Sequence, residues 1–284
     1  MSKIQFTLTV EEGKQMIANG VARHFLTDRS LRSGKVVLKG GTTVSKIAEI
    51  LIGEALRICG RITGRGTVAN LINTDGPHTV LIEKGKYKNI DDCVAEEMQG
   101  LGPHDLIICG ANAIDGEGRA ALMAGSPGGG NIGRALSSWY SEGIPILIPV
   151  GIEKLIPGSL EEIIGLTGRK GKDLSWGMSV GLMPIQGEVI TEIEAVKYLA
   201  NVECYAIGAG GIDDGQGSIT LEARGEDAEI EKLIEIVKSV KDRDCGVSGI
   251  KQSLVQCEAP CASCARHIGC GYKSGRLGEE RREQ

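Results

Sequence analysis

Aromatic residues are scarce in this chain of 284 residues, which contains only two Trp, five Tyr and two Phe. Proteins that bind single-stranded nucleic acids stack the bases on aromatic rings, and so few rings argue against such a surface. The net charge of −5 points the same way, because broad contact with a phosphate backbone needs an excess of Lys and Arg. We therefore expect no nucleic-acid partner.

Long apolar runs are also missing. No uninterrupted apolar stretch approaches the ~18 residues of a membrane-spanning helix, and the N-terminal segment lacks the apolar core of a signal peptide. We expect a cytoplasmic protein that does not bind membranes. Disulfides are rare in that compartment, so the nine cysteines indicate metal or redox chemistry rather than a disulfide framework.

Glycine, in contrast, is abundant, with 42 residues, about twice the usual share. Hydrophobic residues at 41% and charged residues at 24% are ordinary values for a globular protein. The length allows about one to two domains. Many tight turns together with aliphatic strands favour an α/β protein.

Apolar segments alternate with helical patterns through residues 1–185. This alternation predicts a Rossmann-like α/β domain, with a mostly parallel sheet and helices on both faces. A change of pattern then predicts a small α+β subdomain at 186–245, and a Cys-rich metal-binding tail follows at 246–284. The expected strands are residues 36–38, 79–82, 106–109, 146–150, 204–207 and 218–221, and the expected helices are residues 10–26, 44–58, 91–98, 132–141, 191–200 and 226–240.

The most informative motif is a short glycine turn at residues 39–43. It follows an apolar strand-like run and precedes a segment whose apolar residues recur at helical spacing. Two glycines allow a sharp turn, a threonine can cap the helix, and the helix N-terminus beside a lysine can hold an anion. The pattern also fits a plain strand–turn–helix joint without a ligand. The predicted ligand-binding residues of this turn are Lys39, Gly40, Gly41, Thr42 and Thr43.

Two further glycine-rich segments belong to the same predicted sheet. The strand at 106–109 runs into residues 110–116, which place Asn112 and Asp115 beyond its carboxyl end. A run of glycines then precedes the helix at 132–141. Ligands in open parallel sheets bind beyond the carboxyl ends of the strands, so we expect all three segments to meet at one edge. The glycine run adds Gly128, Gly129, Gly130 and Asn131 to the predicted ligand-binding residues.

The order of these motifs resembles that of the ribose-5-phosphate isomerase, glucosamine-6-phosphate deaminase and CoA-transferase superfamily. In the isomerase, a glycine turn with Ser or Thr holds the sugar phosphate, and a later strand ends in Gly-Ala-Asp-x-x-Asp before a multi-glycine loop. Here residues 110–115 have Asn112 in place of the first aspartate, while Asp115 matches the second. The resemblance implies a Rossmann-like fold, a phosphorylated or CoA/acyl-type anionic substrate, and isomerase or transferase activity.

The surroundings of the glycine run depart from the isomerase pattern. In the isomerase, a lysine precedes the loop and a catalytic glutamate follows it closely. Here Ser126 and Pro127 precede the loop, and residues 131–135 contain no carboxylate. Aldose–ketose isomerisation needs a base within hydrogen-bond reach of the substrate. We therefore predict that Asp115 is the proton acceptor or binds a substrate hydroxyl, and that Asn112 orients the substrate.

A competing interpretation treats the same glycines as a dinucleotide-binding fingerprint. Gly128-x-Gly130-x-x-Gly133 has the required spacing, and residues 121–124 are the candidate strand before it. Glu153 follows Gly133 by twenty residues, a spacing that suits an acid on a ribose hydroxyl. This pattern predicts a dinucleotide-dependent oxidoreductase.

Four cysteines near the C-terminus form a second strong signal. They lie within fourteen residues, so one compact loop can bring four thiolates around a single ion or cluster. Only one pair has the x2 spacing of a zinc knuckle, whereas iron–sulfur loops tolerate irregular spacing. We therefore expect a [4Fe–4S] cluster, with zinc as the alternative metal and His267 and Cys245 as substitute ligands. The predicted metal ligands are Cys257, Cys261, Cys264 and Cys270.

Together these patterns predict an enzyme that binds a small anionic metabolite at three glycine-rich loops. The alternative from another class is a non-catalytic sensor of a ligand or of redox state, because no clear catalytic carboxylate follows the glycine run. Cys109 ends a strand beside the predicted site, and it is the remaining thiol to test for catalysis. A homo-oligomer is compatible with the sequence.

Overall fold

A computed structural model describes residues 1–27, 34–69, 75–243, 245–254 and 268–270. Within them the chain forms a mixed α/β structure with seven α-helices and a six-stranded central sheet. The strand order of this sheet is β12-β10-β7-β2-β5-β6. The bounds of the strands are Glu188–Ile190 for β12, Ile146–Pro149 for β10, Leu106–Cys109 for β7, Val36–Lys39 for β2, Thr79–Glu83 for β5 and Lys86–Asn89 for β6.

The central sheet is parallel in one part and antiparallel in the other. Strands β12, β10, β7 and β2 are parallel, whereas β5 runs antiparallel to both β2 and β6. Between β5 and β6 lie Lys84 and Gly85, with φ values of 50° and 75°. Positive φ at both turn residues is typical of a two-residue hairpin. The expectation of a mostly parallel sheet therefore fits four strands and misses this hairpin.

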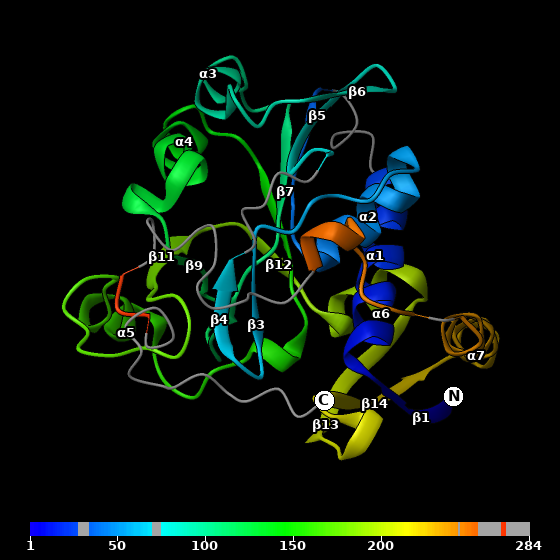
Figure 1. Cartoon of the computed structure of the whole chain (residues 1–284). Helices are drawn as coiled ribbons and strands as arrows, with labels where there is room; N and C mark the ends of the chain where they lie inside the picture. The colour runs from blue at the N-terminus through cyan, green and yellow to red at the C-terminus, as the bar shows by residue number, and fades with distance from the viewer. Residues whose placement is uncertain (28–33, 70–74, 244, 255–267, 271–284) are drawn as a thin grey trace.

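Helices cover both faces of the central sheet (Figure 1). Helices α1 (Val10–Thr27), α2 (Thr42–Ile52) and α6 (Glu192–Leu199) pack on one face, and α1 contacts both of the others. Helices α3 (Val94–Gln99) and α4 (Gly130–Ser141) pack on the opposite face. Burial on both sides explains why the strands are apolar at nearly every position.

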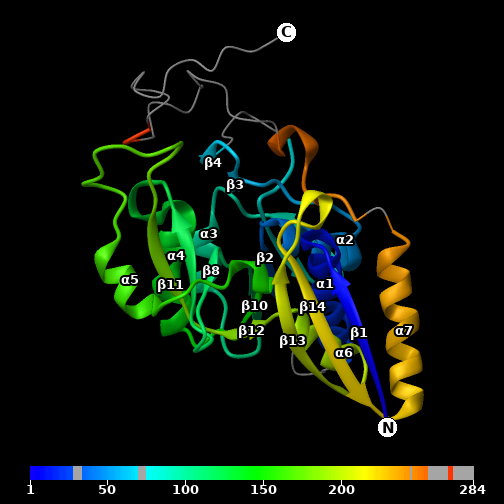
Figure 2. The same ribbon diagram turned by 90° about the horizontal axis from the view of Figure 1, so that it is seen from below.

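A second sheet is formed by the two ends of the chain. Strand β1 (Ser2–Leu8) pairs with β14 (Ser218–Gly225), which also pairs with β13 (Val202–Gly210). Figure 2 shows these strands side by side, with α7 (Asp227–Lys241) next to β1. The small α+β unit expected at 186–245 thus includes the N-terminal strand. Residues 188–190 fall within the bounds expected for that unit, but they form β12 of the central sheet, a strand that was not predicted.

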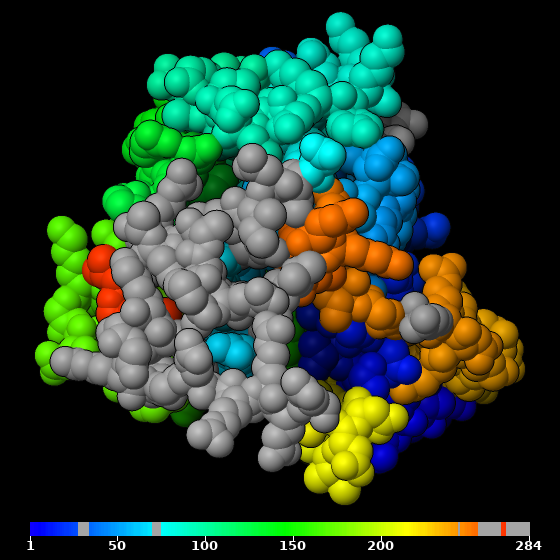
Figure 3. Space-filling view, in the orientation of Figure 1, coloured from blue at the N-terminus to red at the C-terminus, as the bar shows by residue number. Residues whose placement is uncertain are grey.

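The remaining elements are short. Strands β8 (Ala113–Ile114), β9 (Ala120–Ala124) and β11 (Gly181–Ile185) form an antiparallel sheet, and α5 (Leu160–Leu166) contacts β11. Strands β3 (Gly60–Thr63) and β4 (Gly66–Ala69) form a hairpin. Residues 245–254, in orange, lie on the surface beside residues 42–58 in light blue (Figure 3), where Ile250 N donates to Leu56 O at 3.1 Å.

Candidate functional site

The turn between β2 and α2 lies at the carboxyl edge of the parallel strands. Lys39 is in register with Cys109 of β7 and Thr79 of β5. The next residue, Gly40, donates its N–H to the carbonyl of His78 at 2.6 Å. A Cβ at Gly40 would lie 2.5 Å from His78 Nδ1 and 2.8 Å from Arg57 O. Only glycine therefore fits where the turn packs against residues 57 and 78.

Helix α2 begins without a side-chain cap from any residue that the structure describes. Its N-cap is Gly41, whose extended backbone has φ of −179°. The amide N–H groups of a first helical turn have no acceptor within their own helix, and they form the positive end of the helix dipole. Within that turn, the Thr43 side chain is buried, and its Oγ1 has no hydrogen-bond partner in the described part of the chain. The start of α2 is thus rich in unused hydrogen-bonding groups.

Acidic residues distinguish the other helices from α2 and α4. Each of α1, α3, α5, α6 and α7 carries two acidic residues in its first turn, which complement the helix dipole. Helices α2 and α4 carry none, and both begin directly after glycine-rich turns. The two helices without an acidic residue in their first turn are therefore the two that the sequence associates with ligand binding.

A hydrogen-bonded chain joins the starts of these two helices. Asp91 accepts from the backbone N–H groups of His78 at 2.9 Å and Thr79 at 2.7 Å, and it pairs with Arg57 Nη2 at 2.7 Å. The Asn131 amide in the first turn of α4 donates to the Asp91 carbonyl at 2.7 Å. Since Gly40 is bonded to His78, the start of α2 and the start of α4 are held at the same edge of the sheet.

The imidazole of His78 is neutral in this environment. Burial lowers its pKa first, and the neighbouring charge of Lys39 lowers it further. Its Nδ1 lies 2.7 Å from the Arg57 carbonyl, which can only accept, so the ring proton is on Nδ1. Nε2 consequently keeps a lone pair, and His78 can accept a hydrogen bond near Lys39.

The glycine run sets the backbone conformation at the start of α4. Gly128, Gly129 and Gly130 have φ values of 62°, 76° and 68°, a conformation that side chains other than glycine rarely adopt. A Cβ at Gly129 would also lie 2.2 Å from Met183 Sδ. The glycine run thus fixes the start of α4, which Asn131 links through Asp91 and His78 to the turn at Gly40.

The dinucleotide interpretation lacks its strand–helix–strand context. Strand β9, which precedes the glycine run, pairs antiparallel with β8 and β11. The fingerprint requires its first strand to lie in the same parallel sheet as the strand after the helix. Here that following strand is β10 of the central sheet, so the spacing of the glycines is not accompanied by the expected fold.

Asp115 and Asn112 have structural partners that replace their predicted roles. The Asp115 carboxylate accepts from the backbone N–H groups of Glu117, Arg119 and Leu160 and from Arg119 Nε, at 2.7 to 3.0 Å. Despite burial, these hydrogen bonds lower its pKa to about 2, so it is a poor proton acceptor. Asn112 Oδ1 accepts from Met123 N at 2.9 Å. Both residues stabilise the turns around β8 and β9, and these contacts argue against the predicted catalytic roles.

The cysteines fall into two groups. Cys257, Cys261 and Cys264 lie outside the described residues, as does His267. Cys270 is half-buried, and its backbone pairs with that of Ser175 in an isolated parallel β-bridge. No group of three or more His, Cys, Asp or Glu side chains in the described ranges is arranged to hold a metal ion. Cys109 is fully buried, and burial raises the pKa of its thiol, which disfavours the nucleophilic thiolate.

A group of buried charges is the feature that the sequence interpretation missed. We call it the buried charged cluster, and it lies where α1, α2, α6 and the short helix η2 (Ile152–Lys154) meet. The signal in the sequence is a lysine within an apolar helical pattern, as with Lys46 beside Ile47 and Ala48. The cluster consists of Glu11, Lys14, Lys46, Glu153, Lys154 and Glu192.

Desolvation affects the charge states in this cluster. The pKa of Glu192 is raised to about 7, chiefly by burial and also by the negative charge of the adjacent Glu153. Burial also lowers the pKa of Lys154, while the three glutamates partly offset this effect. Groups with such opposing shifts are common at functional sites.

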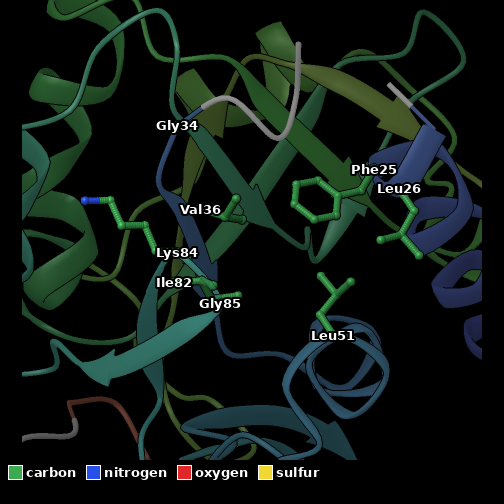
Figure 4. Close-up of a pocket in the computed structure, with 8 residues that line it drawn as sticks. All are labelled: Phe25, Leu26, Gly34, Val36, Leu51, Ile82, Lys84 and Gly85. Atoms are coloured by element: carbon green, nitrogen blue, oxygen red, sulfur yellow. The ribbon is translucent and has the colours of Figure 1, made fainter. Parts of the chain in front are cut away.

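An apolar pocket of about 560 Å³ lies at the opposite end of β2 (Figure 4). Phe25 of α1, Leu51 of α2, Val36 and Ile82 line it, and Lys84 extends away from the aromatic ring. It contains none of the predicted site residues. The carboxyl edge, rather than this pocket, therefore remains the candidate site.

No helix in the described ranges combines the length and apolar character needed to cross a bilayer. No protein-family model, curated protein or solved structure matches the chain. The function must consequently be argued from the geometry of the carboxyl edge.

Proposed function

We propose that the protein is an enzyme that binds a small anionic metabolite at the carboxyl edge of its central sheet. The anion, a phosphate or a carboxylate, lies at the uncapped start of α2, near Lys39 and within reach of the start of α4. The observation that carries the proposal is the missing negative charge at these two helices, because the other five described helices each supply their own. An anion at this position would supply the negative charge that the other helices carry in their own first turns.

The position of the site in the sheet supports the same assignment. Helix α2 follows β2 on one face, whereas α4 follows β7 on the other. Neighbouring strands whose helices leave in opposite directions open a crevice at their carboxyl ends, where α/β proteins bind ligands. The resemblance in motif order to sugar-phosphate isomerases and CoA-transferases fits a phosphorylated or acyl-type substrate, and we propose isomerase or transferase chemistry.

Calorimetric titration with ethyl phosphate, acetate and acetyl-CoA tests the binding step. The wild-type protein should bind at least one of these probes, and Lys39→Gln should weaken that binding at least tenfold because it removes a full positive charge beside the turn. Lys3→Gln is the matched control, since Lys3 lies on exposed strand β1 and pairs with Glu222. Equal binding by Lys39→Gln and the wild type would contradict the location of the anion.

Turnover requires a separate measurement. Incubation of the protein with a panel of sugar phosphates in D₂O, followed by NMR, would detect isomerisation or exchange of a substrate C–H proton. A protein that binds these anions and converts none of them would be a sensor rather than an enzyme.

We also propose the C-terminal metal site as a separate element. Four thiolates would hold a [4Fe–4S] cluster, or zinc as the alternative. Of the four cysteines, Cys270 is the one that the structure describes, and it is half-buried with a free thiol. Anaerobic purification with a visible spectrum and metal analysis tests this. A brown protein with about four irons per chain supports the cluster, whereas a colourless protein with one zinc contradicts it.

A further inference from the structure

The buried charged cluster lies against the same carboxyl edge, on the face covered by α1, α2 and α6. Lys154 Nζ donates to the carbonyl of Ala111, two residues beyond the end of β7, at 3.0 Å. Glu192 Oε2 accepts from Ile152 N at 2.9 Å. These contacts hold η2 and the start of α6 close to the end of β7. Thr43 and Lys46, one turn apart on α2, lie on the same side of that helix.

The lysines of the cluster are paired and still have donors to spare. Lys14 lies 2.6 Å from Glu11 Oε1, and Lys46 lies 3.8 Å from Glu11 Oε2. Lys46 also donates to Gly246 O at 2.8 Å. Each ammonium group carries three N–H donors, so both lysines and Lys154 retain donors for a further acceptor. Lys14 and Lys46 are 8% and 4% exposed, which makes unused donors costly unless something occupies the site.

Three buried oxygens around these lysines have no hydrogen-bond partner in the described residues. They come from three different elements, α1, α2 and η2, and are Glu11 Oε2, Thr43 Oγ1 and Glu153 Oε2. Nearly all buried polar atoms in folded proteins find a partner. Glu11 Oε2 lies 3.8 Å from Lys46 Nζ, which joins α1 to α2. Glu192 accepts from Ile152 N of η2, and its Oε1 would lie 2.6 Å from a Cβ at Gly13 of α1. These contacts bring the carboxylates and the lysines together where α1, α2, α6 and η2 meet.

We infer that the buried charged cluster is a binding subsite for a ligand group that brings its own hydrogen-bond donors, either neighbouring hydroxyls or an amine. The inference rests on the proposed function, since this group belongs to the same metabolite whose anion lies at the start of α2. Carboxylates only accept hydrogen bonds, so a bare phosphate or carboxylate leaves Glu11 and Glu153 unsatisfied. A hydroxyl or amino group satisfies them, and a hydroxyl oxygen can also accept from the lysines.

Thr43 connects the two parts of the site. It lies in the first turn of α2, where the anion is proposed to bind, and its free hydroxyl is buried on the side of Lys46. The expected ligand is therefore short, with its donor-bearing carbons close to the anionic group. Small hydroxylated or amino-bearing phosphates have this form.

Two matched pairs of probes test the subsite by calorimetric titration. Glycerol 3-phosphate is compared with propyl phosphate, and phosphoethanolamine with ethyl phosphate, so that each pair differs in donors at similar size. In the wild type, at least one donor-bearing probe should bind tenfold or more tightly than its alkyl partner. An advantage for the first pair identifies hydroxyls as the recognised group, and an advantage for the second identifies an amine.

Two variants locate the effect. Glu153→Gln and Thr43→Val should each reduce the affinity ratio of the responding pair at least fivefold. Thr43→Val loses no hydrogen bond within the described residues, so we expect it to fold and the test to remain valid. The matched controls are Glu162→Gln, at an exposed position of α5, and Thr220→Val, at a half-buried position of β14 where the hydroxyl pairs with Thr7. Both should leave the ratio unchanged.

The outcomes separate the two hypotheses. If neither the phosphate probes nor acetate nor acetyl-CoA bind the wild type, the proposed function fails. If the alkyl phosphates bind but neither donor-bearing probe has an advantage, only the subsite inference fails, and the free oxygens bind water alone. The inference would also be overturned if the donor-bearing probe kept its full affinity advantage over its alkyl partner in both Glu153→Gln and Thr43→Val.

Discussion

Gly41→Asp should make the protein more stable and at the same time block anion binding. Gly41 is the N-cap of α2, its backbone is extended, and a Cβ there meets nothing within 4 Å. An aspartate can therefore be accommodated without strain. Its carboxylate would accept from the free N–H groups of the first turn and complement the helix dipole. The variant thus supplies from the chain itself the charge that we assign to the ligand.

The magnitude follows from three contributions. Replacing glycine at a compatible backbone position gains about 0.4–1 kcal/mol from the unfolded state, a negative charge at a helix start gains about 0.3–1 kcal/mol, and the cap adds a few tenths of a kcal/mol over glycine. The sum is about 1–2 kcal/mol. For a chain somewhat larger than 150–250 residues, each kcal/mol raises Tm by about 2–4 °C.

Thermal unfolding at low salt and titration with ethyl phosphate measure the two effects. We expect Gly41→Asp to raise Tm and to weaken phosphate binding at least tenfold. Gly41→Asn is the matched control, because it restores the cap without the charge and should retain more of the binding. A variant with higher Tm and unchanged phosphate affinity would refute the location of the anion, and a lower Tm would refute the open helix start.

Three further predictions concern charge and packing. Glu192→Gln should remove a pH dependence of stability. The pKa of Glu192 is about 7 in the folded protein, against an ordinary value of 4.5. The contribution of the protonated side chain to the free energy of unfolding is therefore complete below about pH 4.5 and is lost as the pH rises through 7. The loss is about 3 kcal/mol in the wild type, and denaturant unfolding at pH 5 and pH 8 should show it; an equal loss in the variant would contradict the assignment. Asp115→Ala should destabilise the fold by about 3 kcal/mol, because it leaves several backbone donors and Arg119 unpaired; a stable variant that loses turnover would restore Asp115 as a catalytic candidate. Gly40→Ala should cost about 1–3 kcal/mol through contact with residues 57 and 78, whereas Gly41→Ala should be close to neutral, and equal Tm values for the two would contradict the packing at this turn.

Local patterns in the sequence were sufficient for the elements that depend on neighbouring residues. The strands at 36–38, 106–109, 204–207 and 218–221 appear where they were predicted. The helix expected at 44–58 begins close to its predicted start but ends at Ile52. Such elements follow from side-chain periodicity and from glycine positions, which are visible along the chain. The uncapped start of α2 was not anticipated, because a threonine was expected to cap this helix. In the structure Thr42 and Thr43 lie inside α2, and Gly41 is its N-cap.

The pairing of distant segments was beyond those patterns. Nothing near residues 2–8 indicates that β1 joins β14, since their contact depends on register between strands more than 200 residues apart in sequence. The surroundings of Asp115 could not be foreseen for the same reason, because a motif spacing does not reveal how many donors surround a carboxylate. Its partner Leu160 is 45 residues away.

The sequence by itself therefore determined an α/β protein with glycine turns at the carboxyl ends of its strands, because period, turn chemistry and apolar content are local properties. The tertiary structure alone decided which charges are buried together. Lys46, Lys154 and Glu192 come from three separate segments, and only their packing around α1 excludes water and shifts the pKa values of Lys154 and Glu192. Desolvation is a property of the assembled fold, so the buried charged cluster could not be found from the order of the residues.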